Sequence, residues 1–131
     1  MRRLSRIRTL VGVLAAGCAT AFAGSAAAQA VDEVTVVGHH ADPKLHDEAS
    51  YKVSYADLDL RTQDGRDALN QRIKTTALYV CQKLGEAKEG HSACIDNAIK
   101  QASASARRAA QAAQASHVAW KAGPAWTPPP Q

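Results

Sequence analysis

The sequence lacks any apolar run long enough to cross a membrane as a helix. Its most apolar run, residues 9–23, has 15 residues, whereas a spanning helix needs roughly 20. The chain also lacks a Gly-rich phosphate-binding loop and the sharp turn that presents a catalytic serine. Aromatic residues make up only 5% of it, and its single phenylalanine is Phe22. These absences argue against a transmembrane helix and against the common enzyme motifs.

The first thirty residues are typical of a cleavable secretory signal. A basic start (MRRLSRIR) precedes the apolar run, and Ala28-Gln29-Ala30 fits the small-x-small pattern that signal peptidase accepts. We therefore expect residues 1–30 to be removed and the protein to work in the periplasm. The alternative is a lipid anchor on Cys18, although Ala15 stands where a lipoprotein motif usually has Leu.

The positive charge of the chain belongs to this leader. The sequence has 16 basic and 12 acidic residues, a formal net charge of +4. Removing Arg2, Arg3, Arg6 and Arg8 leaves 12 basic residues against 12 acidic ones. A near-neutral mature chain does not have the basic character expected of a nucleic-acid-binding protein, so no nucleic-acid partner is predicted.

The remaining cysteines predict a covalent link in a small domain. Removing residues 1–30 from the 131 leaves 101, enough for one domain with few large apolar residues. Small exported domains often depend on disulfides, so we predict a bridge between Cys81 and Cys94. The alternative is a redox or nucleophilic thiol beside His91. The spacing offers no C-x-x-C motif that would lower a thiol pKa.

The mature sequence predicts an α+β fold. Residues 31–37 (VDEVTVV) are rich in β-branched side chains, and residues 51–56 (YKVSYA) alternate between apolar and polar. Residues 63–84 carry apolar side chains at helical spacing after Thr62, and Ser92 suits the start of a second helix. We expect two short antiparallel strands packed on a helical hairpin that the cysteine bridge closes.

The end of the sequence predicts a helical extension and a tail. Residues 102–115 are rich in alanine, which favours helix, but they offer no large apolar side chain. We expect a solvated extension that completes a single domain over residues 31–115, with a partner-binding helix as the alternative. Prolines predict a flexible, disordered tail at residues 116–131. Its Trp120 and Trp126 either anchor a partner or fold back onto the domain.

One stretch of the sequence is distinctive. It reads Val53-Ser54-Tyr55-Ala56-Asp57-Leu58-Asp59-Leu60 and is followed by Thr62, Gly65, Arg72-Ile73 and Val80-Cys81. With the strand at residues 31–38 and with Cys94, these residues resemble the UrcA family of small exported alphaproteobacterial proteins. The resemblance covers roughly residues 31–102, but Gln63 stands where a proline is common, and the alanine-rich extension is long. The family has no assigned activity, so the resemblance implies export and a disulfide and supplies no active site.

Three groups of residues invite a chemical interpretation. The loop between His39 and Glu48 (HHADPKLHDE) holds imidazoles and carboxylates that suit a divalent metal ion, although their spacing matches no closed site; a solvated linker is the alternative. Asp57 and Asp59 suit either acid–base chemistry or a turn that accepts backbone N–H groups. Residues 32–38 (DEVTVVG) weakly resemble a segment that binds by strand addition, or they form the leading strand of the domain.

These observations favour a binding protein over an enzyme. We expect a non-enzymatic periplasmic accessory or stress-associated protein that binds an unidentified partner and needs no cofactor. The alternative is metal sequestration through the loop that contains His39, His40 and His46, and a small enzyme ranks third. No catalytic residue and no metal ligand is assigned, and the bridge between Cys81 and Cys94 is the one assigned site.

Overall fold

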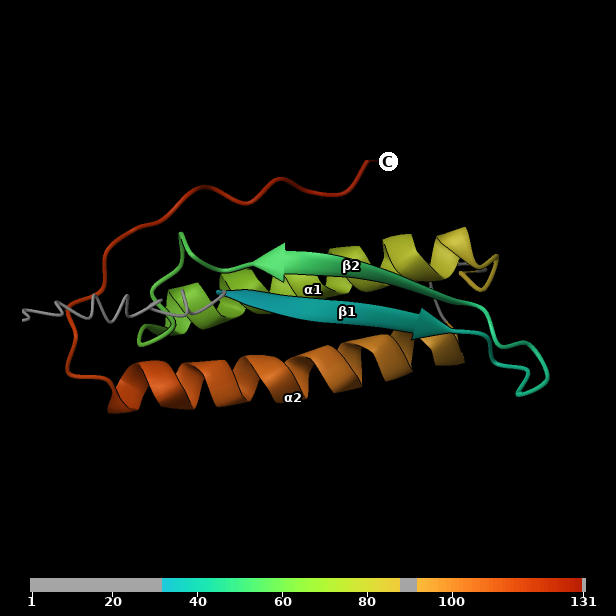
Figure 1. Ribbon diagram of the computed structural model, residues 1–131, viewed down its shortest axis with the longest axis horizontal. Helices are drawn as coiled ribbons and strands as arrows, with labels where there is room; N and C mark the ends of the chain where they lie inside the picture. Colours follow the sequence, from blue (N-terminus) through green and yellow to red (C-terminus); the bar gives the residue numbers. More distant parts are fainter. Residues whose placement is uncertain (1–31, 88–91, 131) are drawn as a thin grey trace, which may run out of the picture.

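The computed structural model describes residues 32–87 and 92–130. The elements follow the order β1 (Glu33–His39), β2 (Glu48–Ser54), α1 (Gln63–Lys83) and α2 (Ala93–Ala115). The strands form one layer and the helices a second layer behind it (Figure 1). The expected α+β fold, two antiparallel strands on a helical hairpin with a Cys81–Cys94 disulfide, is confirmed. The leader, Cys18 and His91 lie outside the described residues.

The two strands form a regular hairpin whose inner face is apolar. Val34 lies opposite Val53, and Val36 lies opposite Tyr51. The three valines are almost completely buried against the helices. The pairing continues through Gly38 and Ala49 to the ends of both strands, so the strands reach further into the linker than the expected boundaries at residues 37 and 51. Main-chain pairing explains this extension, because it does not require apolar side chains.

Gly38 lets the disulfide pack directly against β1. A Cβ at this position would lie 3.0 Å from Val80 Cγ2 and 3.2 Å from the sulfur atoms of both Cys81 and Cys94. The two cysteines are 0% and 2% exposed. The bridge is therefore part of the core, and it holds the end of α1 and the start of α2 against the strand.

Both helices begin at the residues that the sequence indicates. The Thr62 hydroxyl accepts the Gly65 N–H at 3.1 Å, and the Ser92 hydroxyl accepts the Ile95 N–H at 3.2 Å. Side-chain oxygens thus satisfy N–H groups that the first helical turn leaves unpaired. The helix α1 ends at Lys83, and Gly85 follows with φ +72, a backbone conformation that glycine adopts without strain.

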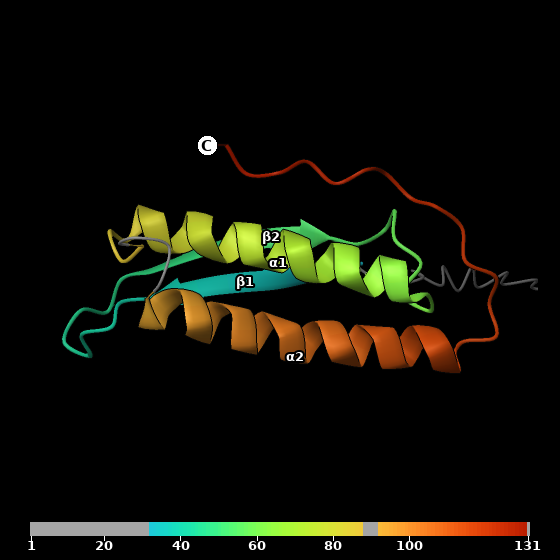
Figure 2. The ribbon, with the colours of Figure 1, turned by 180° about the vertical axis from the view of Figure 1, so that it is seen from behind.

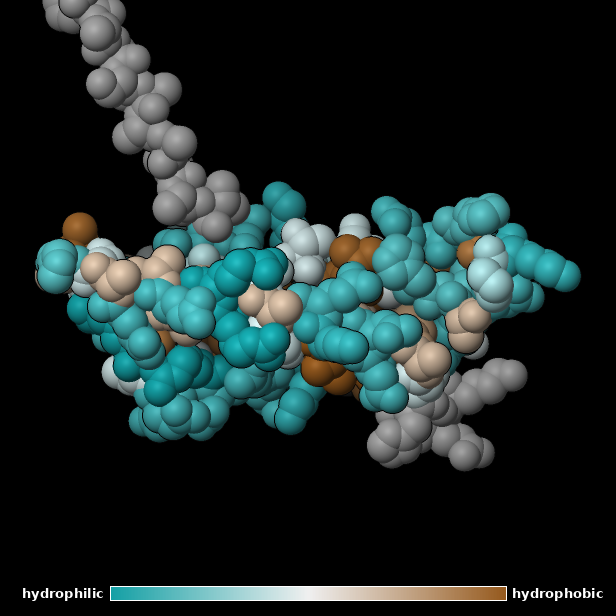
Figure 3. Space-filling view, turned by 90° about the horizontal axis from the view of Figure 1, so that it is seen from below, coloured by the Kyte–Doolittle hydropathy of each residue, from teal (hydrophilic) through white to brown (hydrophobic). Residues whose placement is uncertain are grey.

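The alanine-rich extension is packed, so the prediction of a solvated extension was wrong. Ala102, Ala106 and Ala110 are 1%, 6% and 7% exposed and continue the buried face that begins at Ala98. Their spacing of four residues places the methyl groups on one side of α2. Small side chains bring the helix backbone close to its neighbours, so burial does not require large apolar residues. Seen from the side of α2, most of the surface is hydrophilic (Figure 3).

The segment after α2 contains no helix or strand over residues 117–130, as its prolines predict. It passes round the end of the molecule and returns along the side formed by β2 and α1, away from α2 (Figure 1, Figure 2). Trp126 is half-buried and Pro129 is buried. In the described part of the chain, neither helix has the length and apolar character needed to span a bilayer.

Candidate functional site

The turn between β2 and α1 is organised around Arg72. Its guanidinium donates to both carboxylate oxygens of Asp57, at 2.7 and 2.6 Å, and to the Ser54 carbonyl at 2.8 Å. The hydrogen bonds from Arg72 to the carboxylate are the main cause of the lowered pKa of Asp57, with a smaller contribution from the backbone of Trp126. Asp57 therefore stays ionised and fixes the guanidinium in one orientation.

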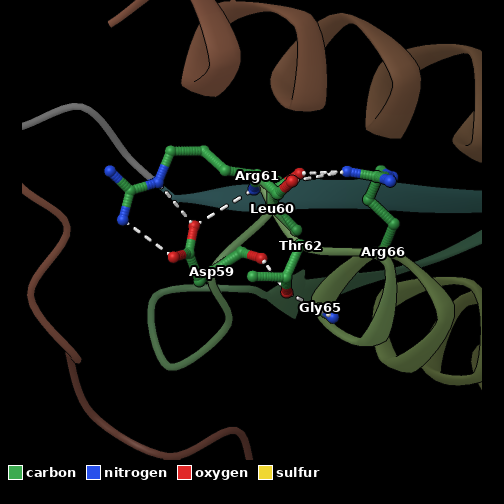
Figure 4. A network of polar contacts seen from close by, with 6 residues as sticks. All are labelled: Asp59, Leu60, Arg61, Thr62, Gly65 and Arg66. Carbon is green, nitrogen blue, oxygen red and sulfur yellow. Dashed lines mark hydrogen bonds and ion pairs between the residues drawn. The ribbon is translucent and has the colours of Figure 1, made fainter. Parts of the chain in front are cut away.

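Asp59 belongs to a second, separate network (Figure 4). Its carboxylate accepts two hydrogen bonds from the Arg61 side chain, both at 2.8 Å, and one from the Arg61 backbone N–H at 3.1 Å. The hydrogen bonds from the side chain are the main cause of its lowered pKa. Its carbonyl accepts the hydroxyl and the N–H of Thr62, and Arg66 donates to the carbonyls of Leu60 and Arg61.

The two carboxylates thus follow the turn interpretation of the sequence. Each is engaged by its own arginine, and Asp59 accepts a backbone N–H as turn-forming aspartates do. Leu60, next to them, is only 3% exposed and anchors the turn in the core. The distinctive run from Ser54 to Leu60 therefore builds the connection between the sheet and α1.

The structure does not gather the histidines of the hairpin loop. The His40 Nδ1 atom lies 2.8 Å from Glu86 Oε1, which ties the loop to the segment after α1. The His39 Nδ1 atom lies 3.9 Å from Glu48 Oε2, and His46 is exposed. Within residues 32–87 and 92–130, no three His, Cys, Asp or Glu side chains form a group that could hold a metal ion.

The tail segment, defined here as residues 123–130, docks along β2 and α1. The Gly123 N–H donates to the Ala56 carbonyl at 2.8 Å. A Cβ on Gly123 would lie 2.7 Å from the Ala56 Cβ, so this approach requires glycine. Arg72 then lies over the Trp126 ring, 5.1 Å from its centroid. Asp57, Arg72 and Trp126 therefore form one stack that joins the turn to the tail segment.

The prolines of the tail segment lie beside an aromatic surface on α1. Tyr79 contacts Tyr51 of β2 edge to face, with ring centroids 5.7 Å apart. A cavity of about 430 Å³ remains between α1 and the prolines, lined by Thr75, Leu78, Tyr79, Gln82, Pro128, Pro129 and Pro130. We call the surface made by Ala56, Arg72 and these four α1 residues the tail groove.

The fit of the tail segment in this groove is incomplete. The Trp126 Nε1 atom is buried and has no hydrogen-bond partner among the described residues. A second hollow of about 430 Å³ separates residues 124–127 from the ends of the strands. An unpaired buried N–H costs about 1–3 kcal/mol. The tail segment therefore binds the groove less tightly than a ligand that pairs this N–H and fills the hollow would.

Sequence reasoning identified Trp126 but not the surface beneath it. Of the two roles left open for the tryptophans, folding back is the one seen for Trp126, whereas Trp120 is 43% exposed. Arg72 gave no signal of this role, because its neighbours come from distant parts of the chain. No protein-family model, curated protein or solved structure matches this chain.

Proposed function

We propose that the protein is a non-enzymatic accessory protein of the periplasm, related to the UrcA family, that binds extended proline-containing peptide segments. The tail groove is the proposed binding surface. The observation that carries this proposal is the docked tail segment: a Pro-rich stretch lies in the groove, with Trp126 stacked under Arg72 and Pro129 buried.

The chemistry of the groove suits such a ligand. Proline-rich segments are already extended before binding, so they lose little conformational entropy when they dock on aromatic surfaces. Tyr79 provides such a surface, and the guanidinium of Arg72 provides a flat cation for an aromatic side chain. The Ala56 carbonyl adds a main-chain contact that does not depend on the ligand's sequence.

The same features support exchange of the occupant. Trp126 Nε1 has no hydrogen-bond partner among residues 32–87 and 92–130, and a cavity remains beside the prolines. A partner peptide that satisfies this N–H or fills the cavity gains binding energy. The tail segment has the advantage of its tether, which gives a flexible linked segment an effective concentration of about millimolar. A partner therefore competes with the tail segment for the groove.

The location is supported by two independent features. The leader sequence is typical of export, and a core disulfide between Cys81 and Cys94 suits an oxidising compartment.

Binding in trans tests the function. Protein ending at Ala115 is purified from the periplasm and titrated with a fluorescein-labelled peptide of residues 120–130 (WKAGPAWTPPP), and binding is followed by fluorescence anisotropy. We expect saturable binding to this protein and at least about tenfold weaker binding to the full chain, whose own tail segment competes. The same peptide with Trp126→Ala is expected to bind poorly, and the matched Trp120→Ala peptide is expected to bind as the parent does.

Two results would contradict the proposal. One is a shortened protein that retains its helical circular dichroism and its disulfide and yet binds none of the peptides. The other is equal binding of the Trp126→Ala and Trp120→Ala peptides. If the shortened protein does not fold, the full chain with Trp126→Ala replaces it, because its groove is expected to be open to the labelled peptide.

A further inference from the structure

The seam between α1 and α2 carries a hollow on its solvent side, away from the sheet and the tail groove. The two helices lie side by side along their lengths (Figure 2). A cavity of about 320 Å³ between them is lined by Asn70 and Lys74 of α1 and by Ile99, Ser103 and Arg107 of α2. A smaller hollow of about 60 Å³ adjoins it and shares Asn70 and Arg107. We call the two together the seam hollow.

The seam hollow concentrates positive charge. Among the residues that the structure describes, Lys74 and Arg107 take part in no ion pair. Arg66 adds a third cation at the smaller hollow, where its hydrogen bonds to the carbonyls of Leu60 and Arg61 hold it in place. Of the described residues that line the two cavities, none carries a carboxylate.

Three other cations of the fold, in contrast, each have a carboxylate partner. Arg72, Arg61 and Lys52 each pair with a carboxylate, at 2.6, 2.8 and 3.2 Å. Lys74 and Arg107 instead bring like charges to one cavity across the seam, an arrangement that repels without a counter-ion. A bound anion would remove this repulsion.

The donor set suits a tetrahedral oxyanion. The Arg107 guanidinium offers a fork of N–H groups, the Lys74 ammonium offers a point charge, and the Asn70 amide and the Ser103 hydroxyl offer neutral donors. Hydrogen bonds from a charged donor to a phosphate are stronger than those between neutral groups. We propose that the seam hollow binds a phosphate group, held between Lys74 and Arg107.

Phosphate titration of the isotope-labelled protein, purified after export with its tail segment intact, tests this site. Inorganic phosphate is added at constant ionic strength, and the backbone and side-chain signals are followed by nuclear magnetic resonance. We expect saturable shifts centred on Asn70, Lys74, Ser103 and Arg107. Arg107→Gln is expected to weaken binding about tenfold, the equivalent of one charge-assisted hydrogen bond. Arg108→Gln is the matched control and is expected to leave binding unchanged, because Arg108 donates to the Ser105 hydroxyl and lines neither cavity.

A second arm distinguishes the source of the phosphate group. Vesicles of phosphatidylglycerol are compared with vesicles of phosphatidylcholine, whose phosphate is paired with its own choline cation. Binding of the phosphatidylglycerol vesicles that Arg107→Gln removes and Arg108→Gln spares, without an effect of inorganic phosphate, assigns the site to a lipid headgroup. Both arginines are exposed, so neither substitution removes buried contacts. The proposal would be overturned if phosphate caused no shifts and the phosphatidylglycerol vesicles did not bind, or if Arg107→Gln and Arg108→Gln weakened binding equally.

Discussion

Gly65→Ala is expected to destabilise the protein, although glycine-to-alanine changes in helices usually stabilise. Gly65 is the third residue of α1, where alanine would ordinarily add about 0.5–1 kcal/mol of stability. In this structure the new Cβ would lie 2.1 Å from the Asp59 carbonyl oxygen and 2.7 Å from its carbon. Both atoms belong to the backbone, so no side chain can rotate away to relieve the contact.

The expected loss of stability depends on how far the turn at Asp59 has to move. Real Cβ atoms essentially never come closer than 3.0 Å, so the turn at Asp59 must retreat by about 0.9 Å, the difference between 3.0 and 2.1 Å. That movement breaks the hydrogen bond from the Gly65 N–H to the Thr62 hydroxyl (Figure 4). Losing this cap costs about 1 kcal/mol, and overpacking costs about 1–3 kcal/mol more. After the gain in helix propensity, the net loss is about 1–3 kcal/mol.

Urea unfolding followed by circular dichroism measures this loss, with Thr62→Ala as the companion variant. Thr62→Ala removes the same cap without the steric overlap and is expected to cost about 1 kcal/mol. In the double variant the cap can be lost only once, so the combined loss is expected to fall short of the sum of the two. A Gly65→Ala protein as stable as the parent, or more stable, would refute the reasoning.

Three further outcomes are expected. Replacing Cys81 and Cys94 together by Ala should cost about 3 kcal/mol in urea unfolding, because the bridge closes a loop with a separation of 13 residues; unchanged stability would contradict this. The folded-state pKa of Asp57 is lowered, so its ion pair stabilises the fold above the unfolded pKa of about 4 and is lost as the pH falls through the folded value. The stability difference between the parent and Asp57→Asn should therefore shrink on acidification, and a constant difference in an acid titration would speak against the ion pair. Ala102→Leu should lower the thermal midpoint by overpacking worth about 1–3 kcal/mol, whereas the exposed neighbour Gln101→Leu should leave it nearly unchanged; similar effects of the two would show that Ala102 is not buried.

The elements that obey local rules could be predicted from the sequence. Thr62 and Ser92 start the helices because a hydroxyl at this place satisfies N–H groups of the first turn, a property visible in five residues of sequence. The apolar spacing of α1 and the alternation in β2 depend on the same short range. The ends of the strands could not be placed, because main-chain pairing between Gly38 and Ala49 joins residues whose side chains carry no strand signal.

The candidate sites could not be predicted in the same way, because their contacts join residues that are far apart in the sequence. The packing of Ala106 depends on how closely two helices approach, which composition does not report. Arg72 pairs with Asp57, fifteen residues earlier, and stacks on Trp126 near the other end of the described chain. Lys74 and Arg107 meet only because the helical hairpin folds them to the same seam. Each of these contacts is set by tertiary structure.

The position of the disulfide determines the direction in which the two helices can separate. Cys81 lies at the end of α1 and Cys94 at the start of α2, so a covalent hinge fixes one end of the pair. At the other end the helices are held by methyl groups such as that of Ala110 and by the turn before Gly65. The amplitude of any local opening should therefore grow with distance from the hinge. The tail leaves α2 at this freer end and contacts Ala56 close to it. Its docking and release therefore take place at the end of the molecule where the two helices separate most readily.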